Sequence, residues 1–479
     1  MKVILINHNE EYAVREMISA HIPKIKIEST DIIPDYGDYL VSEINEEENN
    51  ITYSALLSLD GKEYKYSHQK DIYNKTYVKK SVNEVMKKAL GTYLPWGLIT
   101  GIRPGKLARE MAQSGLEDSE ILKKFTDFYE CSDEKARLSV DVSKREKKLI
   151  DTMPKDSISL YVGIPFCPTR CLYCSFVSAD LRYTKKYVED YVRLLGREIE
   201  YSAQKIKEHG LNVQSVYFGG GTPTSLSAEA LDFLLTQVQK HIDLTNTVEF
   251  CVEAGRPDTI TKEKLETLKK HGVTRISINP QTMNDKTLEA IGRAHSAADI
   301  CATFALARSL GFDNINTDLI VGLPMETEAD FAHTLSRISD LHPENITVHT
   351  MSVKRGSALH QKLGDYSLTN PDTVNAMLTL AQSFMQGIHY EPYYMYRQKN
   401  MLGNFENVGY TKPGCESIYN INIMEEVQTI LALGGSASSK FVDPKTDRIE
   451  RIFNFKSPIE YINRFDEILK KKDDFFAML

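Results

Sequence analysis

The fold of this 479-residue chain depends on one stretch, Tyr161-Val-Gly-Ile-Pro-Phe-Cys167-Pro-Thr-Arg-Cys171-Leu-Tyr-Cys174-Ser-Phe176. Directly after an apolar run it places three thiols, with three and then two residues between them. Three thiolates can hold three irons of a cubic 4Fe–4S cluster and leave the fourth iron open to an outside ligand. Tyr173 and Phe176, beside the third thiol, fit a cluster that is kept partly dry, which affects its reduction potential. The stretch therefore predicts a metal cluster with one open position.

Two other interpretations of the thiols are a zinc site and unpaired structural cysteines. A structural zinc ion needs four tetrahedral ligands, and the fourth would have to come from a distant part of the chain. The Cys-x3-Cys-x2-Cys spacing resembles that of radical S-adenosylmethionine (SAM) enzymes. The resemblance implies that the amine and carboxylate of SAM occupy the open iron.

The composition is that of a globular chain of about three domains, with 42% hydrophobic and 26% charged residues. Seven cysteines, three of them in one loop, do not resemble a disulfide framework and indicate a reducing cytoplasm. A net charge of -8 argues against a broad nucleic-acid footprint. The N-terminus lacks the apolar core of a signal peptide, and no later segment approaches an 18-residue apolar run. We expect a soluble, cytoplasmic protein without a membrane span.

Residues 1–150 are predicted to form a separate α+β domain. A short buried strand at 3–6 precedes a helical pattern through Met17 and Ile18. Alternating segments between 38 and 66, with Asp60-Gly61 at a turn, predict a hairpin. Helices dominate from Val82 onward, and the only tryptophan, Trp96, is expected to be buried between them.

Residues 151–355 are predicted to form a core barrel of alternating strands and helices. Apolar, β-branched runs occur near 158–164, 213–218, 247–253, 274–279, 315–321 and 345–352, with helical periodicity in most gaps. The fold class is α/β, and six consecutive parallel strands match the partial (β/α)6 radical-SAM barrel that the resemblance implies. A doubly wound sheet would show the same alternation of strands and helices. Residues 356–479 are predicted to be an α+β extension packed on the barrel, with a long helix around 371–387.

Polar motifs fall where the predicted strands end, and active residues of such barrels collect at the C-terminal ends of strands. The cysteine loop follows the first strand, and Gly219-Gly220-Gly221-Thr222-Pro223-Thr224 follows the second. Glu253 ends the third strand, Gln281 lies just past the fourth, and Asp318 lies within the fifth.

The glycine run and Glu253 each have two interpretations. Glycines let the backbone approach a small polar ligand closely, although three of them can equally form a plain strand-to-helix turn. A buried, unpaired carboxylate is costly, so Glu253 needs a partner. That partner is either a pair of ribose hydroxyls or one of two cations, Arg256 and Arg275.

Five motifs within residues 157–355 together resemble the oxygen-independent coproporphyrinogen III oxidase family. They are Tyr161-Val-Gly-Ile-Pro-Phe-Cys, the Gly-Gly-Gly-Thr-Pro-Thr run, Asn279-Pro-Gln281, Ile291-Gly-Arg293-Ala-His295 and Asp318-Leu-Ile-Val-Gly-Leu-Pro324. Outside them, Thr100-Gly-Ile-Arg-Pro-Gly and Tyr396-Arg-Gln-Lys-Asn-Met-Leu-Gly-Asn-Phe-Glu-Asn-Val-Gly-Tyr410 resemble the HemZ-type branch, so 356–479 would be a HemN/HemZ-like domain.

The resemblance implies a 4Fe–4S cluster on Cys167, Cys171 and Cys174, with one SAM contacted by Tyr161, Gly220 and Glu253. It also implies a second SAM, for which the matching positions are Tyr173, Gly221, Thr222, Gln281, Arg293 and Asp318. The implied activity is oxidative decarboxylation of two propionates of coproporphyrinogen III, giving protoporphyrinogen IX in heme biosynthesis. The cofactors perform the bond breaking, so no side chain is given a catalytic role beyond binding them. The implied partners are a tetrapyrrole substrate and a small electron-transfer protein such as a flavodoxin or ferredoxin, without nucleic acid.

The chain departs from the pattern at two places that concern the substrate. Coproporphyrinogen-oxidising members of the family carry a fourth cysteine where this chain has Phe176, and the heme-chaperone branch carries phenylalanine there. The His-Asn-x-x-Tyr-Trp motif of that branch is replaced here by Arg397-Gln-Lys-Asn400. Arg397 and Lys399 are predicted propionate contacts, with surface solvation as the alternative. The alternative functions are heme binding or trafficking and another radical SAM modification of a tetrapyrrole.

Overall fold

The computed structural model describes residues 1–23, 25–101, 103–175, 178–354, 356–361, 369–398, 405–443, 445–446 and 448–479. The chain forms two compact units, one of Met1–Ser143 with Tyr396–Glu406, the other of Lys144–Met395 with Asn407–Leu479. The division near residue 143 is close to the predicted boundary at 150. The predicted boundary at 355 does not separate two compact units, because most of 356–479 belongs to the second unit.

The first unit is built on a five-stranded sheet in the order β2-β1-β3-β4-β5. Asp60 and Gly61 both have positive φ, 50° and 74°, as the predicted hairpin turn between β4 and β5 requires. Trp96 is buried, with 2% of its surface exposed. The elements are β1 Lys2–Ile6, α1 Glu11–His21, β2 Glu28–Ser29, β3 Tyr39–Glu47, β4 Asn50–Leu59, β5 Lys62–Lys70, α2 Lys75–Leu90, α3 Pro104–Gln113, α4 Asp118–Lys123, η1 Lys124–Phe128 and α5 Asp133–Ile150, which continues into the second unit.

The second unit contains the six predicted parallel strands, and neighbours in the sheet are also neighbours in the sequence, β6-β9-β10-β11-β12-β13. A doubly wound sheet would reverse its order near the middle, so that alternative is wrong. The first strand is buried on both faces, as a helix-covered parallel strand should be. The strands are β6 Ser157–Ile164, β9 Asn212–Gly220, β10 Glu249–Gly255, β11 Arg275–Ile278, β12 Ile315–Val321 and β13 Asn345–Thr350.

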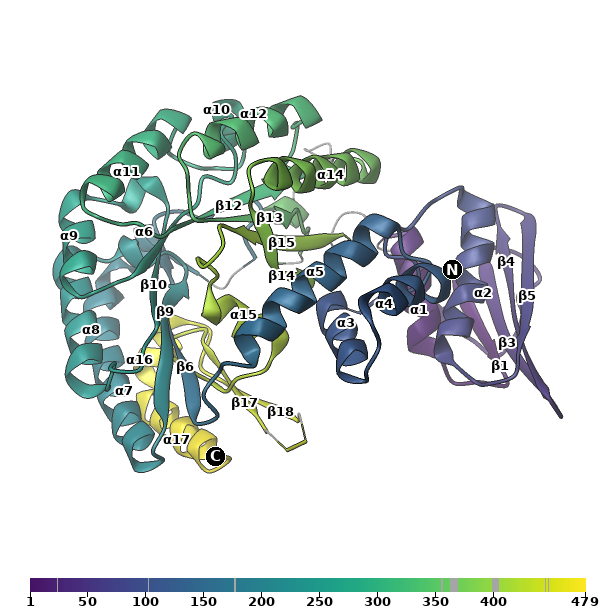
Figure 1. Cartoon of the computed structure of the whole chain (residues 1–479), viewed down its shortest axis with the longest axis horizontal. Helices are drawn as coiled ribbons and strands as arrows, with labels where there is room; N and C mark the ends of the chain where they lie inside the picture. Colours follow the sequence, from purple (N-terminus) through teal and green to yellow (C-terminus); the bar gives the residue numbers. More distant parts are fainter. Residues whose placement is uncertain are drawn as a thin grey trace. The chain divides into compact units, whose positions relative to one another are not determined.

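Helices follow the strands and lie on the outer side of the sheet, as Figure 1 shows for α7, α8, α9, α11 and α12. No described helix has the length and apolar character that crossing a lipid bilayer requires. The helical elements are α6 Leu181–Thr184, η2 Lys185–Tyr187, α7 Val188–Glu208, η3 Pro223–Ser225, α8 Ala228–His241, η4 Pro257–Thr259, α9 Lys262–Lys270, α10 Asp285–Ala290, α11 Ala297–Ser309, α12 Glu328–Ser339, α13 Ala358–Gln361 and α14 Pro371–Gly387.

C-terminal strands extend both ends of the parallel sheet. β15 pairs antiparallel with β13, and β16 pairs in parallel with β6 on the opposite side. β6 and β13, the first and last of the six parallel strands, therefore each pair with a strand from the C-terminal part of the chain. Among the described strands, β6 and β13 do not pair with each other. The fold is the partial barrel that was predicted. The remaining elements are β7 Phe166–Cys167, β8 Ala179–Asp180, β14 Glu391–Arg397, β15 Glu406–Thr411, α15 Ile418–Glu425, β16 Ile430–Leu433, β17 Ser438–Val442, β18 Ile449–Phe453, α16 Pro458–Asn463 and α17 Phe465–Phe476.

Candidate functional site

The three thiols lie in the loop that leaves the C-terminal end of β6, and none of the three is in a disulfide bond. The loop begins with β7, which pairs with β8. Cys171 is buried, and its carbonyl oxygen accepts a hydrogen bond from the backbone N–H of Cys174 at 3.1 Å. The backbone N–H of Leu172 donates to Ile291 O at 3.0 Å, which ties the loop to the segment after α10. The pairing of β7 with β8 and these two backbone hydrogen bonds thus hold the loop in place.

The glycine run brings the end of β9 against this loop. The backbone N–H groups of Gly221 and Thr222 donate to Ile164 O and Phe166 O, both at 2.8 Å. A Cβ atom on Gly221 would lie 2.5 Å from the Phe166 carbonyl oxygen. Gly220 has φ 113°, a conformation that other residues rarely adopt. Gly221 is therefore required because the backbone of the cysteine loop comes so close, and Gly220 because of its backbone conformation.

Replacing Gly221 with alanine is expected to destabilise the cysteine loop. The new methyl group meets backbone that cannot rotate away, and overpacking of this kind costs about 1–3 kcal/mol. The measurement is chemical denaturation of the apoprotein. Gly387→Ala is the matched control, because a Cβ there meets nothing within 4 Å. Equal stability of the two variants would contradict the packing argument.

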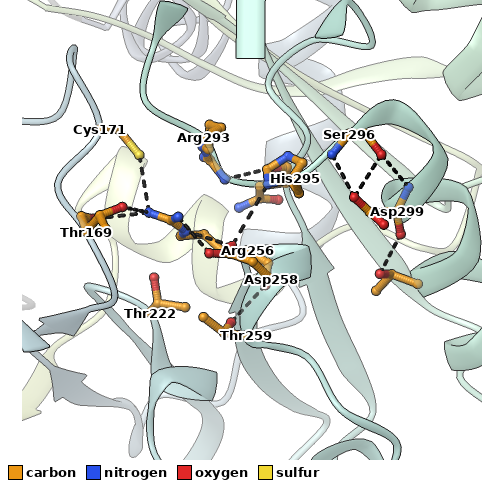
Figure 2. Close-up of polar contacts among 12 residues, drawn as sticks. Thr169, Cys171, Thr222, Arg256, Asp258, Thr259, Arg293, His295, Ser296 and Asp299 are labelled. Carbon is orange, nitrogen blue, oxygen red and sulfur yellow. Dashed lines mark hydrogen bonds and ion pairs between the residues drawn. The ribbon is translucent and has the colours of Figure 1, made fainter. Parts of the chain in front are cut away.

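Two of the thiols form hydrogen bonds with residues at the ends of neighbouring strands. The Thr222 hydroxyl lies 3.6 Å from Cys167 Sγ. The Arg256 guanidinium donates to Cys171 Sγ at 3.8 Å (Figure 2). Burial raises the pKa of the Cys167 thiol, and the hydroxyl of Thr222 opposes that rise. Among the described residues, no three His, Cys, Asp or Glu side chains are grouped as ligands of one metal ion. Soft thiolates with N–H and O–H donors around them are a donor set that suits an iron–sulfur cluster.

Tyrosine rings and Glu253 line the barrel interior beside the loop. Tyr161 on β6 is in register with Tyr217 on β9, and their rings stack with centroids 6.2 Å apart. Tyr419 from α15 stacks on Tyr217 at 4.3 Å. The Tyr217 hydroxyl donates to Glu253 Oε1 at 2.6 Å. Stacked tyrosine rings therefore lie beside the Glu253 carboxylate at the end of β10.

The structure contradicts the proposed ion pairs of Glu253. Arg256 is paired with Asp258 at 2.8 Å, and Arg275 lies 4.0 Å from Glu249. Burial, together with the charge of Asp318, raises the pKa of Glu253 to about 7, although the Tyr217 hydrogen bond opposes the rise. Glu253 is thus paired with neither Arg256 nor Arg275, and the charge of His349 also opposes the rise of its pKa. Contact with ribose hydroxyls stays a prediction.

Replacing Glu253 with glutamine is expected to flatten the pH dependence of stability. Because the folded-state pKa is above its ordinary value of 4.5, wild-type protein has this stabilisation in full below pH 4.5 and loses it as the pH rises through 7. The pKa difference corresponds to about 3 kcal/mol of stability lost by pH 8. Denaturation of both apoproteins at pH 5 and pH 8 measures the difference. If the difference in unfolding free energy between wild type and Glu253→Gln were the same at pH 5 and pH 8, the raised pKa of Glu253 would be contradicted.

Gln281 and Asp318 are held together by backbone hydrogen bonds. The N–H of Gln281 donates to Asp318 O at 3.0 Å, and that of Ile320 donates to Gln281 O at 2.9 Å. These bonds fix Gln281 in a left-handed conformation, φ 71°, which is unusual for this residue. Strain of this kind is common at binding sites. Burial alone would raise the pKa of Asp318, but His349 and Asn316 lower it overall.

Arg293 and Tyr173, both predicted to contact a second SAM, contact each other. Arg293 Nη2 donates to the Tyr173 hydroxyl at 2.8 Å, and Nη1 donates to Asn279 O at 3.2 Å. Its Nε–H is buried without a hydrogen-bond partner in the described part of the chain. An unused donor of this kind fits a ligand with an acceptor group, such as a carboxylate.

Of the two predicted propionate contacts, the structure describes only Arg397. Arg397 is 3% exposed in the first unit, donates to Ile99 O at 2.5 Å and lies 5.2 Å from the centre of the Trp96 ring. Solvation at the surface, the alternative for Arg397, is therefore wrong. Lys399 and Phe176 lie outside the described residues. Substrate contact by Arg397 and Lys399 stays a prediction.

Several residues of the site were not predicted from the sequence. Tyr217 could have been found, because it precedes the glycines by two positions and so shares the strand face that Gly219 occupies. Tyr419 carries no local signal, since it comes from a helix far along the chain. Arg256 was considered only as a partner of Glu253, although it bonds to Cys171 and Asp258.

The comparisons with known proteins agree with this geometry. A profile of the Radical SAM superfamily matches residues 161–338. The chain is 44% identical over 380 residues to the oxygen-independent coproporphyrinogen-III oxidase-like protein HemZ of Bacillus subtilis, covering 79% of this chain and 76% of that protein. It is 32% identical to the heme chaperone HemW of the same organism, covering 56% of this chain and 68% of that protein.

Among solved structures, coproporphyrinogen III oxidase (HemN) from Escherichia coli, a radical SAM enzyme, shares the fold. The TM-score is 0.52 at 24% identity, covering 68% of this chain and 72% of that chain. Superfamily membership implies a 4Fe–4S cluster and SAM. This chain belongs to the family of radical SAM proteins that includes HemZ.

Proposed function

We propose that this protein is a radical SAM oxidoreductase that decarboxylates two propionate side chains of coproporphyrinogen III, giving protoporphyrinogen IX. The observation that carries the chemistry is the loop of three thiols outside any disulfide at the end of β6, where Arg293 donates a hydrogen bond to Tyr173 of the same loop. The 44% identity to HemZ supports the substrate class.

In this proposal Cys167, Cys171 and Cys174 hold the cluster. Tyr161, Gly220 and Glu253 contact the SAM beside it, and a second SAM is held by Tyr173, Gly221, Thr222, Gln281, Arg293 and Asp318. When bound, the cluster and SAM would supply the one-electron chemistry that removes a hydrogen atom from the β-carbon of a propionate. The rest of the task is positioning and exclusion of water.

The side chains of the site are suited to those two tasks. Glu253 can accept hydrogen bonds from two ribose hydroxyls while Tyr217 keeps it in place. Arg293 can bind a carboxylate through the N–H that is still unused. Stacked rings of Tyr161, Tyr217 and Tyr419 cover the interior beside them and keep water from reactive species. Electrons would come from a small protein such as a flavodoxin or ferredoxin.

The test is anaerobic reconstitution of the full chain with iron and sulfide, then incubation with coproporphyrinogen III, SAM and a reductant. We expect 5′-deoxyadenosine together with a porphyrin that carries two carboxylates. Formation of 5′-deoxyadenosine without decarboxylation would keep the class of enzyme and reject this substrate. It would then favour another tetrapyrrole as the substrate of the same site.

A second candidate function is heme binding or trafficking, which the 32% identity to HemW favours. A heme titration of the purified chain distinguishes the two candidates. Tight binding of heme, with no turnover of coproporphyrinogen III, would support the heme-binding function and contradict the oxidase. Turnover without tight binding of heme would do the opposite.

A further inference from the structure

Arg256 lies just beyond β10 and reaches the cysteine loop. Its side chain is 4% exposed. Nη1 donates to the Thr169 carbonyl and hydroxyl oxygens, both at 3.0 Å, and to Cys171 Sγ at 3.8 Å. Figure 2 shows the guanidinium between this part of the loop and Asp258. One cation therefore contacts both the backbone and a thiol of the loop.

The guanidinium is fixed in this position from its other side. Its Nε and Nη2 donate to the two oxygens of Asp258 at 2.9 and 2.8 Å, in the bidentate geometry that orients arginine strongly. Asp258 is itself in the short helix η4, and the buried ring of His295 packs 3.9 Å from its Oδ1. The Asp258 carboxylate thus lies on the side of the guanidinium that faces away from Cys171. Nη1 on the other side donates to Cys171.

We propose that Arg256 is a positioning residue that sets the reduction potential of the cluster through Cys171. This inference rests on the proposed binding of the cluster by the three thiols. Adding an electron makes an iron–sulfur cluster more negative, and hydrogen bonds to its sulfurs and nearby charge stabilise that form. A fixed guanidinium with an N–H directed at a ligand sulfur makes both contributions. Arg256 therefore raises the midpoint potential.

The test is a redox titration of the anaerobically reconstituted full chain, without SAM or tetrapyrrole, followed by electron paramagnetic resonance. Arg256→Gln keeps an N–H donor and removes the charge. We expect its equilibrium constant for one-electron reduction to fall about tenfold, which is a midpoint lower by about 59 mV. Arg256→Lys, which keeps the charge but not the planar fork, should lie between this variant and wild type.

Arg308→Gln is the matched control. Arg308 is also an arginine of the second unit bonded to a carboxylate, Glu344 at 2.9 Å, and to backbone carbonyl groups. It contacts the segment that precedes β12, at the edge opposite the cysteine loop. The midpoint potential of the cluster in Arg308→Gln should equal that in wild type.

The outcomes separate this inference from the proposed function. Wild-type protein that takes up no cluster would contradict the proposed function. A clustered Arg256→Gln variant with the wild-type midpoint would reject only the role of Arg256. If neither Arg256 variant assembles a cluster while Arg308→Gln does, Arg256 serves to fold the loop, and its role in setting the potential is rejected.

Discussion

Replacing Cys171 with serine is expected to remove the 4Fe–4S cluster and, with it, the formation of 5′-deoxyadenosine. A serine hydroxyl is a harder and far less acidic ligand than a thiol, so the soft iron–sulfur unit loses one of its three attachments. Changes in the outer shell of a metal site already cost 10–100-fold, so we expect activity to fall about 100-fold or more. Iron and sulfide content, visible absorption and deoxyadenosine yield measure the effect.

Cys301→Ser is the matched control for this experiment. Its thiol lies on α11 and also accepts a hydrogen bond from an arginine, Arg337 Nη2 at 3.7 Å. The contact is thus similar, but the residue is not in the cysteine loop. Cys301→Ser should retain the cluster and full activity. A Cys171→Ser variant that keeps both the cluster and deoxyadenosine formation would contradict the assignment of the ligands.

The strands of the barrel could be predicted because their burial is imposed by the fold itself. A parallel strand covered on both faces must be apolar along its whole length, and the run that ends at Ile164 has that character. Predicted strands at 158–164 and 315–321 correspond to β6 Ser157–Ile164 and β12 Ile315–Val321. The predicted helix around 371–387 corresponds to α14 Pro371–Gly387, and proline at its first position suits the start of a helix.

The site could be predicted only where its residues lie in short motifs at strand ends. Glu253 and Gln281 were proposed in this way. The contact between Arg256 and Cys171 joins residues 85 positions apart, and the stacking of Tyr419 on Tyr217 brings a C-terminal helix into the barrel. Such contacts depend on which strand lies beside which, so no local pattern in the sequence reports them.

The C-terminal segment was predicted to pack on the barrel, and buried polar contacts join it to the barrel. Glu198 on α7 accepts hydrogen bonds from Gly434 N at 2.8 Å, from the Tyr461 hydroxyl at 2.5 Å and from Asn454 Nδ2 at 3.0 Å. Lys472 Nζ lies 3.1 Å from the same carboxylate. Gly434, in turn, approaches Gly163 near the end of β6 so closely that a side chain would not fit. The network therefore supports the strand from which the cysteine loop begins.

Replacing Glu198 with glutamine is expected to lower the stability of the apoprotein by about 3–5 kcal/mol, because it leaves the Lys472 ammonium buried without its counter-charge. Burial already lowers the pKa of Lys472 although Glu198 opposes this, so the loss should shrink at high pH, where the amine becomes neutral. Glu467→Gln is the control, since its ion pair with Arg464 is half exposed and screened by solvent, so its loss should change the stability little. Chemical denaturation followed by circular dichroism measures both variants. Equal losses would mean that the buried network does not hold the C-terminal segment on the barrel.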